Sequence, residues 1–164
     1  MMNRRRLVQW TVGCGVSLAV AAGFILSGRS HRQPLPDDSH EGDLPEAFYQ
    51  TLRSTRENVR AHRNDPEEVR KLARLYQANR RYREARACYQ LIAATPPGLT
   101  ARDHYYLADI AQNENDLASA QTELRAVLQT EPGYVPARLA LAEALFKSGS
   151  EKEAEKEYSA VLAI

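Results

Sequence analysis

The chain has 164 residues, of which 43% are hydrophobic and 26% are charged, as in an average soluble domain. The chain has 22 Lys and Arg against 21 Asp and Glu, a formal net charge of +1. It therefore lacks the surplus of basic residues that is typical of nucleic-acid-binding proteins. Two cysteines exclude a disulfide framework, and 8 Gly with 8 Pro exclude a collagen-like or low-complexity chain. These averages conceal a strong segregation of residue types along the chain.

The N-terminal segment, residues 1–27, predicts a membrane anchor. Residues 7–27 form a run of 21 residues without a charge, which as a helix spans roughly 30 Å, about one hydrocarbon core. Three arginines at 4–6 precede this run, and Arg29 and Arg32 follow it more sparsely. The positive-inside tendency then predicts a single-pass protein with a cytoplasmic N-terminus. The rest of the chain would lie on the extracytoplasmic side, in the periplasm if the protein is bacterial.

Two other interpretations of the same run stay open. Ala19-Val20-Ala21 follows a 12-residue apolar stretch and matches the A-x-A site of a cleaved signal peptide. Within that alternative, the arginines at 4–6 loosely resemble a twin-arginine export signal. A lipoprotein anchor at Cys14 is less favoured, because the apolar run before it has only seven residues and continues past it. An uncleaved signal-anchor is favoured, since apolar residues continue through Leu26.

Residues 28–43 predict a disordered linker. They contain prolines, small residues and mixed charge but few side chains to bury, so a packed structure is not expected. His31 and His40 lie in this segment, where nothing would fix the geometry that a metal site needs.

From residue 44 onward the apolar positions follow helical periodicity, and no stretch alternates as a strand does. Six helices in three pairs are expected, preceded by one further helix over 45–63 that would cap the first pair. The breaks fall at residues 79–80, 96–98, 113–115, 132–133 and 148–149. N-terminal caps are expected at Asp65 with Pro66, at Thr100 with Asp103, and at Ser150 with Glu153.

The three pairs are internal repeats. Aligning Ala85, Ala120 and Ala154 places them 35 and 34 residues apart. Other positions then coincide: Leu72-Ala73 with Leu107-Ala108 and Leu141-Ala142; Tyr89 with Leu124 and Tyr158; Ile92 with Val127 and Val161. This pattern resembles the tetratricopeptide repeat family over residues 66–164, with units 66–99, 101–134 and 135–164 and the best match in the first.

The resemblance implies an all-α fold in which helix-turn-helix units stack into an α-solenoid. It also implies that the first helices of the units line a concave groove that binds peptides. Carried over residue by residue, the groove positions are Arg70, Arg74, Gln77, Arg102, Tyr105, Asp109, Gln112, Asn113, Glu143, Phe146 and Lys147. Some family members clamp a C-terminal carboxylate with Lys and Asn, but Arg74 stands here in place of the Asn.

Charge is polarised along the repeats. Residues 53–86 contain 11 Lys or Arg against 5 Asp or Glu, whereas residues 100–164 contain 6 against 11. The hypothesis is a groove whose basic end takes an acidic or carboxylate-bearing segment; the alternative is that these arginines only solvate a helix pair. Under the hypothesis, charge reversal at Arg70 and Arg74 weakens partner binding without unfolding the domain.

The C-terminal end of the repeats lacks a polar cap. Val161, Leu162 and Ile164 lie in the second helix of the third unit with no further helix after them, although solenoids normally end in a polar-faced cap. Two expectations follow: the native protein continues past residue 164, or this end packs on something else, such as a second copy in a homo-oligomer.

The sequence carries no catalytic constellation. It has no glycine-rich phosphate loop, CxxC pair, HExxH or G-x-S-x-G motif, so an enzyme, a cofactor and a metal are not expected. Cys88 is expected to be a buried, inert thiol, and His104, where the family usually has a large residue, to serve packing. The favoured function is a membrane-anchored scaffold for a protein partner. The alternatives are a self-assembling component and the N-terminal part of a longer exported repeat protein.

Overall fold

The computed structural model describes residues 35–36, 45–62 and 65–163. Within them the structure is all-α and contains no strand. The helices are α1 (Glu46–Ala61), α2 (Pro66–Ala78), α3 (Tyr82–Ala93), α4 (Ala101–Asn113), α5 (Leu117–Thr130), α6 (Val135–Lys147) and α7 (Glu151–Leu162). They agree with the expected cap helix and three helix pairs.

The predicted anchor at 7–27 lies outside the described residues, as does the linker at 28–43 apart from Leu35 and Pro36. Among the helices that the structure does describe, none combines the length and the apolar character needed to cross a membrane.

Two of the expected N-terminal caps are present. The Asp65 side chain accepts a hydrogen bond from the backbone N–H of Glu67 at 2.8 Å, and Pro66 begins α2. At α4 the Thr100 hydroxyl accepts from the backbone N–H of Asp103, while the Asp103 carboxylate accepts from the backbone N–H of Thr100. This reciprocal capping box satisfies two donors that a helix start otherwise leaves unpaired.

The capping box expected at Ser150 is absent. Ser150 has φ −88° and ψ 58°, outside the extended conformation of a capping residue, and its side chain makes no cap hydrogen bond. The backbone N–H of Glu153 instead donates to the carbonyl of Ser150 at 3.1 Å. The start of α5 has a cap that the sequence analysis missed, because the Asp116 carboxylate accepts from Ser119. That contact lowers the pKa of Asp116.

The turn inside each unit has the same backbone geometry. Arg80, Asn115 and Gly149 stand at equivalent places after the first helix, and their φ values are 59°, 60° and 83°. This left-handed conformation ends a helix, and Gly and Asn adopt it at lower cost than other residues. The breaks predicted at these three places are therefore confirmed.

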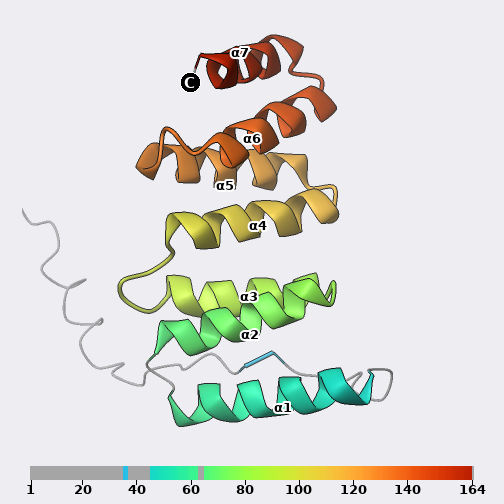
Figure 1. The fold of residues 1–164 in the computed structure, drawn as a ribbon, viewed down its shortest axis with the longest axis vertical. Coiled ribbons are helices and arrows are strands. Elements are labelled where there is room, and N and C mark those ends of the chain that lie inside the picture. The colour runs from blue at the N-terminus through green and yellow to red at the C-terminus, as the bar shows by residue number, and fades with distance from the viewer. Residues whose placement is uncertain (1–34, 37–44, 63–64, 164) are drawn as a thin grey trace, which may run out of the picture. The chain divides into compact units, whose positions relative to one another are not determined.

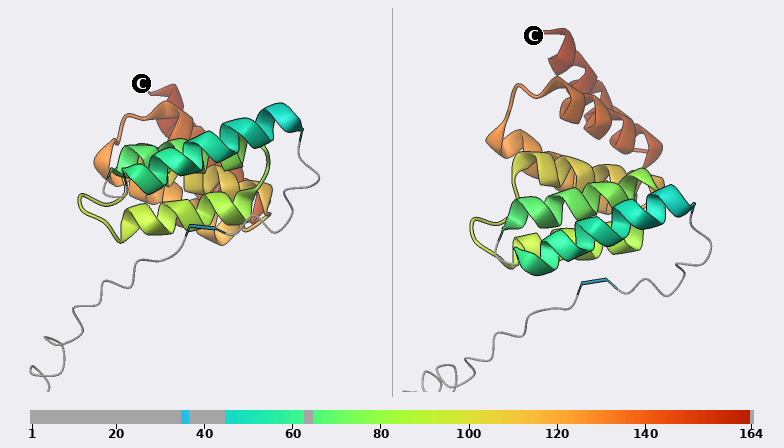
Figure 2. Two further views of the ribbon diagram at one scale, coloured as in Figure 1. Left: turned by 90° about the horizontal axis from the view of Figure 1, so that it is seen from below. Right: turned by 60° about the horizontal axis from the view of Figure 1, so that its bottom comes forward.

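The helices stack in chain order, with α1 at one end and α7 at the other (Figure 1). Seen from the α1 end, α1 lies in front of α2 (Figure 2). Its buried residues Leu52 and Val59 join a core cluster with α2 and α3, as expected for a cap helix. The position shared by Ala85, Ala120 and Ala154 is buried in every unit, which lets the two helices of a unit approach closely.

One helix, α4, belongs to both core clusters. Leu107 and Ile110 pack into the cluster formed with the first unit and α1. Ala108 packs instead with residues of α5, α6 and α7, among them Leu124 and Leu141. Burying apolar surface between neighbouring units is what stabilises a solenoid, so α4 couples the first unit to the third.

Candidate functional site

The first helices α2, α4 and α6 share one face of the stack, here called the first-helix face. The Gln77 side-chain amide on α2 donates a hydrogen bond to the Asp109 carboxylate on α4. The Gln112 amide on α4 donates to the backbone carbonyl of Ala140 on α6 at 3.3 Å. These contacts bring residues more than 25 positions apart side by side, as the repeat register predicts.

Aromatic and charged side chains continue along this face. The ring of Tyr105 meets that of Tyr134 edge to face, with ring centroids 5.5 Å apart. Asn113 donates to the Asp109 backbone carbonyl at 2.8 Å and to its carboxylate at 3.3 Å. Glu143 forms an exposed ion pair with Lys147 at 2.6 Å.

Most of the predicted groove residues lie where a partner could reach them. Arg74, Gln77, Tyr105 and Gln112 are partly buried. The exposed members are Arg102, Asp109, Asn113, Glu143, Phe146 and Lys147. No ion pair within the described part of the chain includes Arg74.

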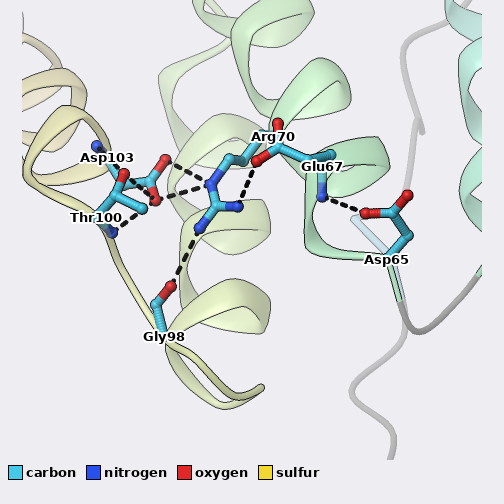
Figure 3. Close-up of polar contacts among 6 residues, drawn as sticks. All are labelled: Asp65, Glu67, Arg70, Gly98, Thr100 and Asp103. Carbon is cyan, nitrogen blue, oxygen red and sulfur yellow. Dashed lines mark hydrogen bonds and ion pairs between the residues drawn. The ribbon is translucent and has the colours of Figure 1, made fainter.

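Arg70 is the exception, and its predicted place in the groove is corrected. It is only 6% exposed, and its guanidinium is surrounded by acceptors (Figure 3). Its Nε donates to both carboxylate oxygens of Asp103 at 3.0 and 2.8 Å. Nη1 donates to Glu67 at 2.8 Å, and Nη2 donates to the backbone carbonyl of Gly98 at 3.1 Å. Arg70 therefore joins α2 to the start of α4 and is not available to a partner.

This cluster of Glu67, Arg70, Gly98 and Asp103 is here called the Arg70 clamp. Burial alone would lower the pKa of Arg70, but the hydrogen bonds and charges of Asp103 and Glu67 outweigh it and raise that pKa. Arg70 therefore stays protonated at any ordinary pH. Because the clamp neutralises Arg70, the cations that the first two units offer on the first-helix face are Arg74 and Arg102.

Two polar contacts between the helices of a unit were not predicted from the sequence. His104 Nδ1 lies 2.7 Å from a carboxylate oxygen of Glu123, and Arg138 Nη1 lies 2.8 Å from one of Glu157. In the first unit the equivalent positions are Val69 and Cys88, both buried and apolar. Each polar replacement on the first helix is therefore matched by an acid 19 residues later on the second. The two pairs occupy equivalent positions in the second and third units. Comparing the units position by position could therefore have revealed them from the sequence.

Cys88 is buried on α3, as predicted. Burial raises its thiol pKa from the ordinary 9.0 to about 12. Between about pH 9 and about pH 12 the folded chain therefore keeps the proton of the Cys88 thiol, whereas the unfolded chain loses it. The stability that this group contributes is complete below about pH 9 and falls as the pH rises from 9 towards 12.

The same burial predicts an unreactive thiol. In a Cys14→Ser background at pH 8, we expect Cys88 to react with Ellman's reagent at least about a hundredfold more slowly than in urea, since reaction requires local opening. The absorbance of the released thiolate measures the rate. Equal rates in the native and unfolded chain would contradict the burial of Cys88.

No cluster of three or more His, Cys, Asp or Glu residues in the described ranges is placed to hold a metal ion. The first-helix face offers amide hydrogen-bond donors, the cations Arg74, Arg102 and Lys147, acids and exposed aromatic rings.

Comparisons with known proteins agree with the repeat architecture. Residues 111–164 match the tetratricopeptide repeat. The matching family profile covers about a third of the chain and starts at the end of α4, so the unit 66–99, expected to match best, falls outside it. No curated protein matches the chain in sequence.

A solved structure shows the same fold over a longer stretch. The crystal structure of MamA superposes with a TM-score of 0.65 at 18% sequence identity. The alignment covers 71% of this chain and 68% of MamA. At that identity the likeness establishes the fold, a helical-repeat solenoid, and nothing further. Repeats of this kind favour a scaffold for protein interaction as the functional class.

Proposed function

We propose that this protein is a non-catalytic, membrane-anchored scaffold that binds a protein or peptide partner on its first-helix face, on the extracytoplasmic side. The observation that carries the binding role is the continuity of that face, since Gln77 contacts Asp109 and Gln112 contacts α6. Three helices then offer one surface, and a partner along it would meet side chains from every unit.

The partner segment in this proposal is acidic or ends in a carboxylate. Arg74 and Arg102 offer cations at the N-terminal part of the face, whereas beyond them Asp109 is an acid and Glu143 is paired with Lys147. Such a gradient favours one direction of binding, with the acidic end of the segment near Arg74. Complementary charge contributes specificity and association rate more than affinity.

The anchor in this proposal is the uncharged run at residues 7–27. The linker at 28–43 has 16 residues, and as a coil it reaches roughly 20–25 Å. The repeats would then work close to the bilayer surface, where a partner attached to the same membrane is at high local concentration.

Site-specific photocrosslinking tests both parts of the proposal in one experiment. A benzophenone amino acid replaces Asn113 on α4 or, as the matched control, Thr122 on α5; both residues are exposed. Membranes are washed with alkaline carbonate before irradiation. We expect the chain to stay in the membrane pellet and to crosslink a partner from position 113 but not from position 122.

The two outcomes are independent. A chain released completely by the carbonate wash would contradict the anchor and leave the binding face untouched. Crosslinks from position 122 without any from position 113 would place the partner on the second helices and contradict the proposed face.

A further inference from the structure

A short segment that precedes the helices packs on the α1 end of the stack, although the sequence predicts a disordered linker there. Leu35 is partly buried and packs against the core cluster at that end. The carbonyl of Pro36 accepts a hydrogen bond from Nη2 of Arg56 on α1, at 3.2 Å. We call Leu35 and Pro36 the strap. Contacts of two kinds, one apolar and one polar, thus join the strap to the helices.

The sequence of the strap suits an extended segment that docks. Leu35 is the one large apolar residue among residues 28–43, so its side chain is the one there that gains most from burial. It stands between Pro34 and Pro36. Proline fixes its own φ angle and restricts the residue before it to extended conformations. The strap therefore loses less conformational freedom on docking than an ordinary linker segment would.

The residue that receives the strap occupies an unusual place on α1. Leu52, Arg56 and Val59 follow helical spacing and share one face of α1, the face that Leu52 and Val59 bury in the core. Burial raises the pKa of Tyr76 on α2 and of Cys88 on α3, and the charge of Arg56 opposes both rises. The guanidinium thus lies on the side of α1 that faces the first unit. A partly buried cation needs acceptors, and the strap carbonyl supplies one.

The strap and α1 close the same end of the stack. Seen from that end, α1 lies in front of α2, and the strap, drawn in blue, lies in front of α3 (Figure 2). The chain divides into two compact units after Gln33, and the strap belongs to the unit that contains the helices. The cap of the first unit therefore has two parts, the helix α1 and the strap.

From these contacts we infer that the strap fastens the linker to the α1 end, so that only residues 28–34 separate the repeats from the membrane anchor. This placement rests on the proposed function, in which residues 7–27 are the anchor. The chain from residue 27 to Leu35 can span at most about 30 Å, whereas the chain from residue 27 to the start of α1 could span about 65 Å. The α1 end of the stack is thus held close to the bilayer. Among the first helices, α2 with Arg74 is then the nearest to the membrane.

Thiol labelling of the full chain in detergent micelles tests whether the strap is docked. In a Cys14→Ser background, Leu35→Cys keeps a small apolar side chain at the contact, and Ser30→Cys in the same linker is the matched control. Cys88 is buried and does not compete for the label. We expect a maleimide to label Leu35→Cys at least about fivefold more slowly than Ser30→Cys in the native chain, and both at equal rates in urea. Equal rates in the native chain would overturn the docking.

Energy transfer to labelled lipids tests the length of the tether. The full chain with Cys14→Ser carries a donor dye on Ser54→Cys, an exposed position of α1, and is reconstituted into vesicles that contain acceptor lipids. An insertion of about 30 glycine and serine residues after residue 30 lengthens the connection between the anchor and the strap, and should lower the transfer at least about twofold. The same insertion after residue 40 lies beyond the strap and should leave the transfer unchanged.

The two experiments separate the strap from the anchor. Equal losses of transfer for the two insertions would show that the linker is not fastened at Leu35 and would overturn the inference. Absence of transfer in every chain would contradict the proposed anchor and, with it, the short tether. Slow labelling of Leu35→Cys would still confirm the docked strap in that case, because the labelling does not depend on a membrane.

Discussion

Replacing Arg70 by methionine is expected to lower the free energy of unfolding by about 3–5 kcal/mol, the cost of breaking a buried ion pair. Methionine retains the packing of the arginine stem but leaves the Asp103 carboxylate, 2% exposed, without its guanidinium partner. The backbone carbonyl of Gly98 loses a donor as well. Urea unfolding of the full chain, followed by circular dichroism of the helices, measures the change.

Two further variants separate the buried pair from its exposed neighbour. Glu67→Gln removes an acid that is 60% exposed in its side chain, so it should cost less than about 1 kcal/mol. The double variant Arg70→Met with Asp103→Asn removes both charges and keeps an acceptor for the Thr100 backbone. It should recover most of the stability lost in Arg70→Met. A loss below about 1 kcal/mol in the single variant would show that the clamp does not hold the two units together.

The helices and repeats could be predicted from sequence because their signals are local or periodic. The Asp65 and Thr100 caps need only neighbouring residues, and the alanine register needs only a count along the chain. Ser150 shows the limit of such signals. Its capping motif is present in the sequence, but the backbone at that turn takes a different conformation and the side chain does not cap.

Arg70 could not be assigned correctly from register alone. Its equivalents Tyr105 and Leu139 are partly or well exposed, so the position lies at the edge of the first-helix face. Whether a long side chain there turns outward or toward the next unit depends on an acceptor across the interface. That acceptor, Asp103, is 33 positions away, and its sequence context predicts only a role in the cap of α4.

The polar pairs inside the units have the same explanation. His104 departs visibly from the repeat pattern, and Glu123 on the second helix of the same unit compensates for that departure. We expected a packing role for His104, and its ring does lie partly buried between the two helices of its unit, held by the acid. Such a pairing can be found in the sequence only when the repeat register is applied to both helices of a unit together.

Replacing Arg74 by glutamate is expected to abolish most partner binding while leaving the fold intact. Arg74 lies one helical turn after Arg70 on α2, but it is partly exposed and outside the clamp. Reversal of its charge places an acid opposite the acidic segment of the proposed partner. We expect at least a tenfold loss of affinity, which corresponds to about 1.4 kcal/mol. Arg83→Glu, an equal charge change at an exposed place on α3, is the matched control.

The most direct test of the scaffold is affinity isolation of the tagged full chain from detergent-solubilised native membranes, with partners quantified by mass spectrometry. Wild type and the Arg83→Glu variant should recover the same partner in equal amounts, and Arg74→Glu should recover at least tenfold less. The urea unfolding curves of the three chains should coincide. Undiminished recovery by a folded Arg74→Glu variant would contradict binding at the first-helix face.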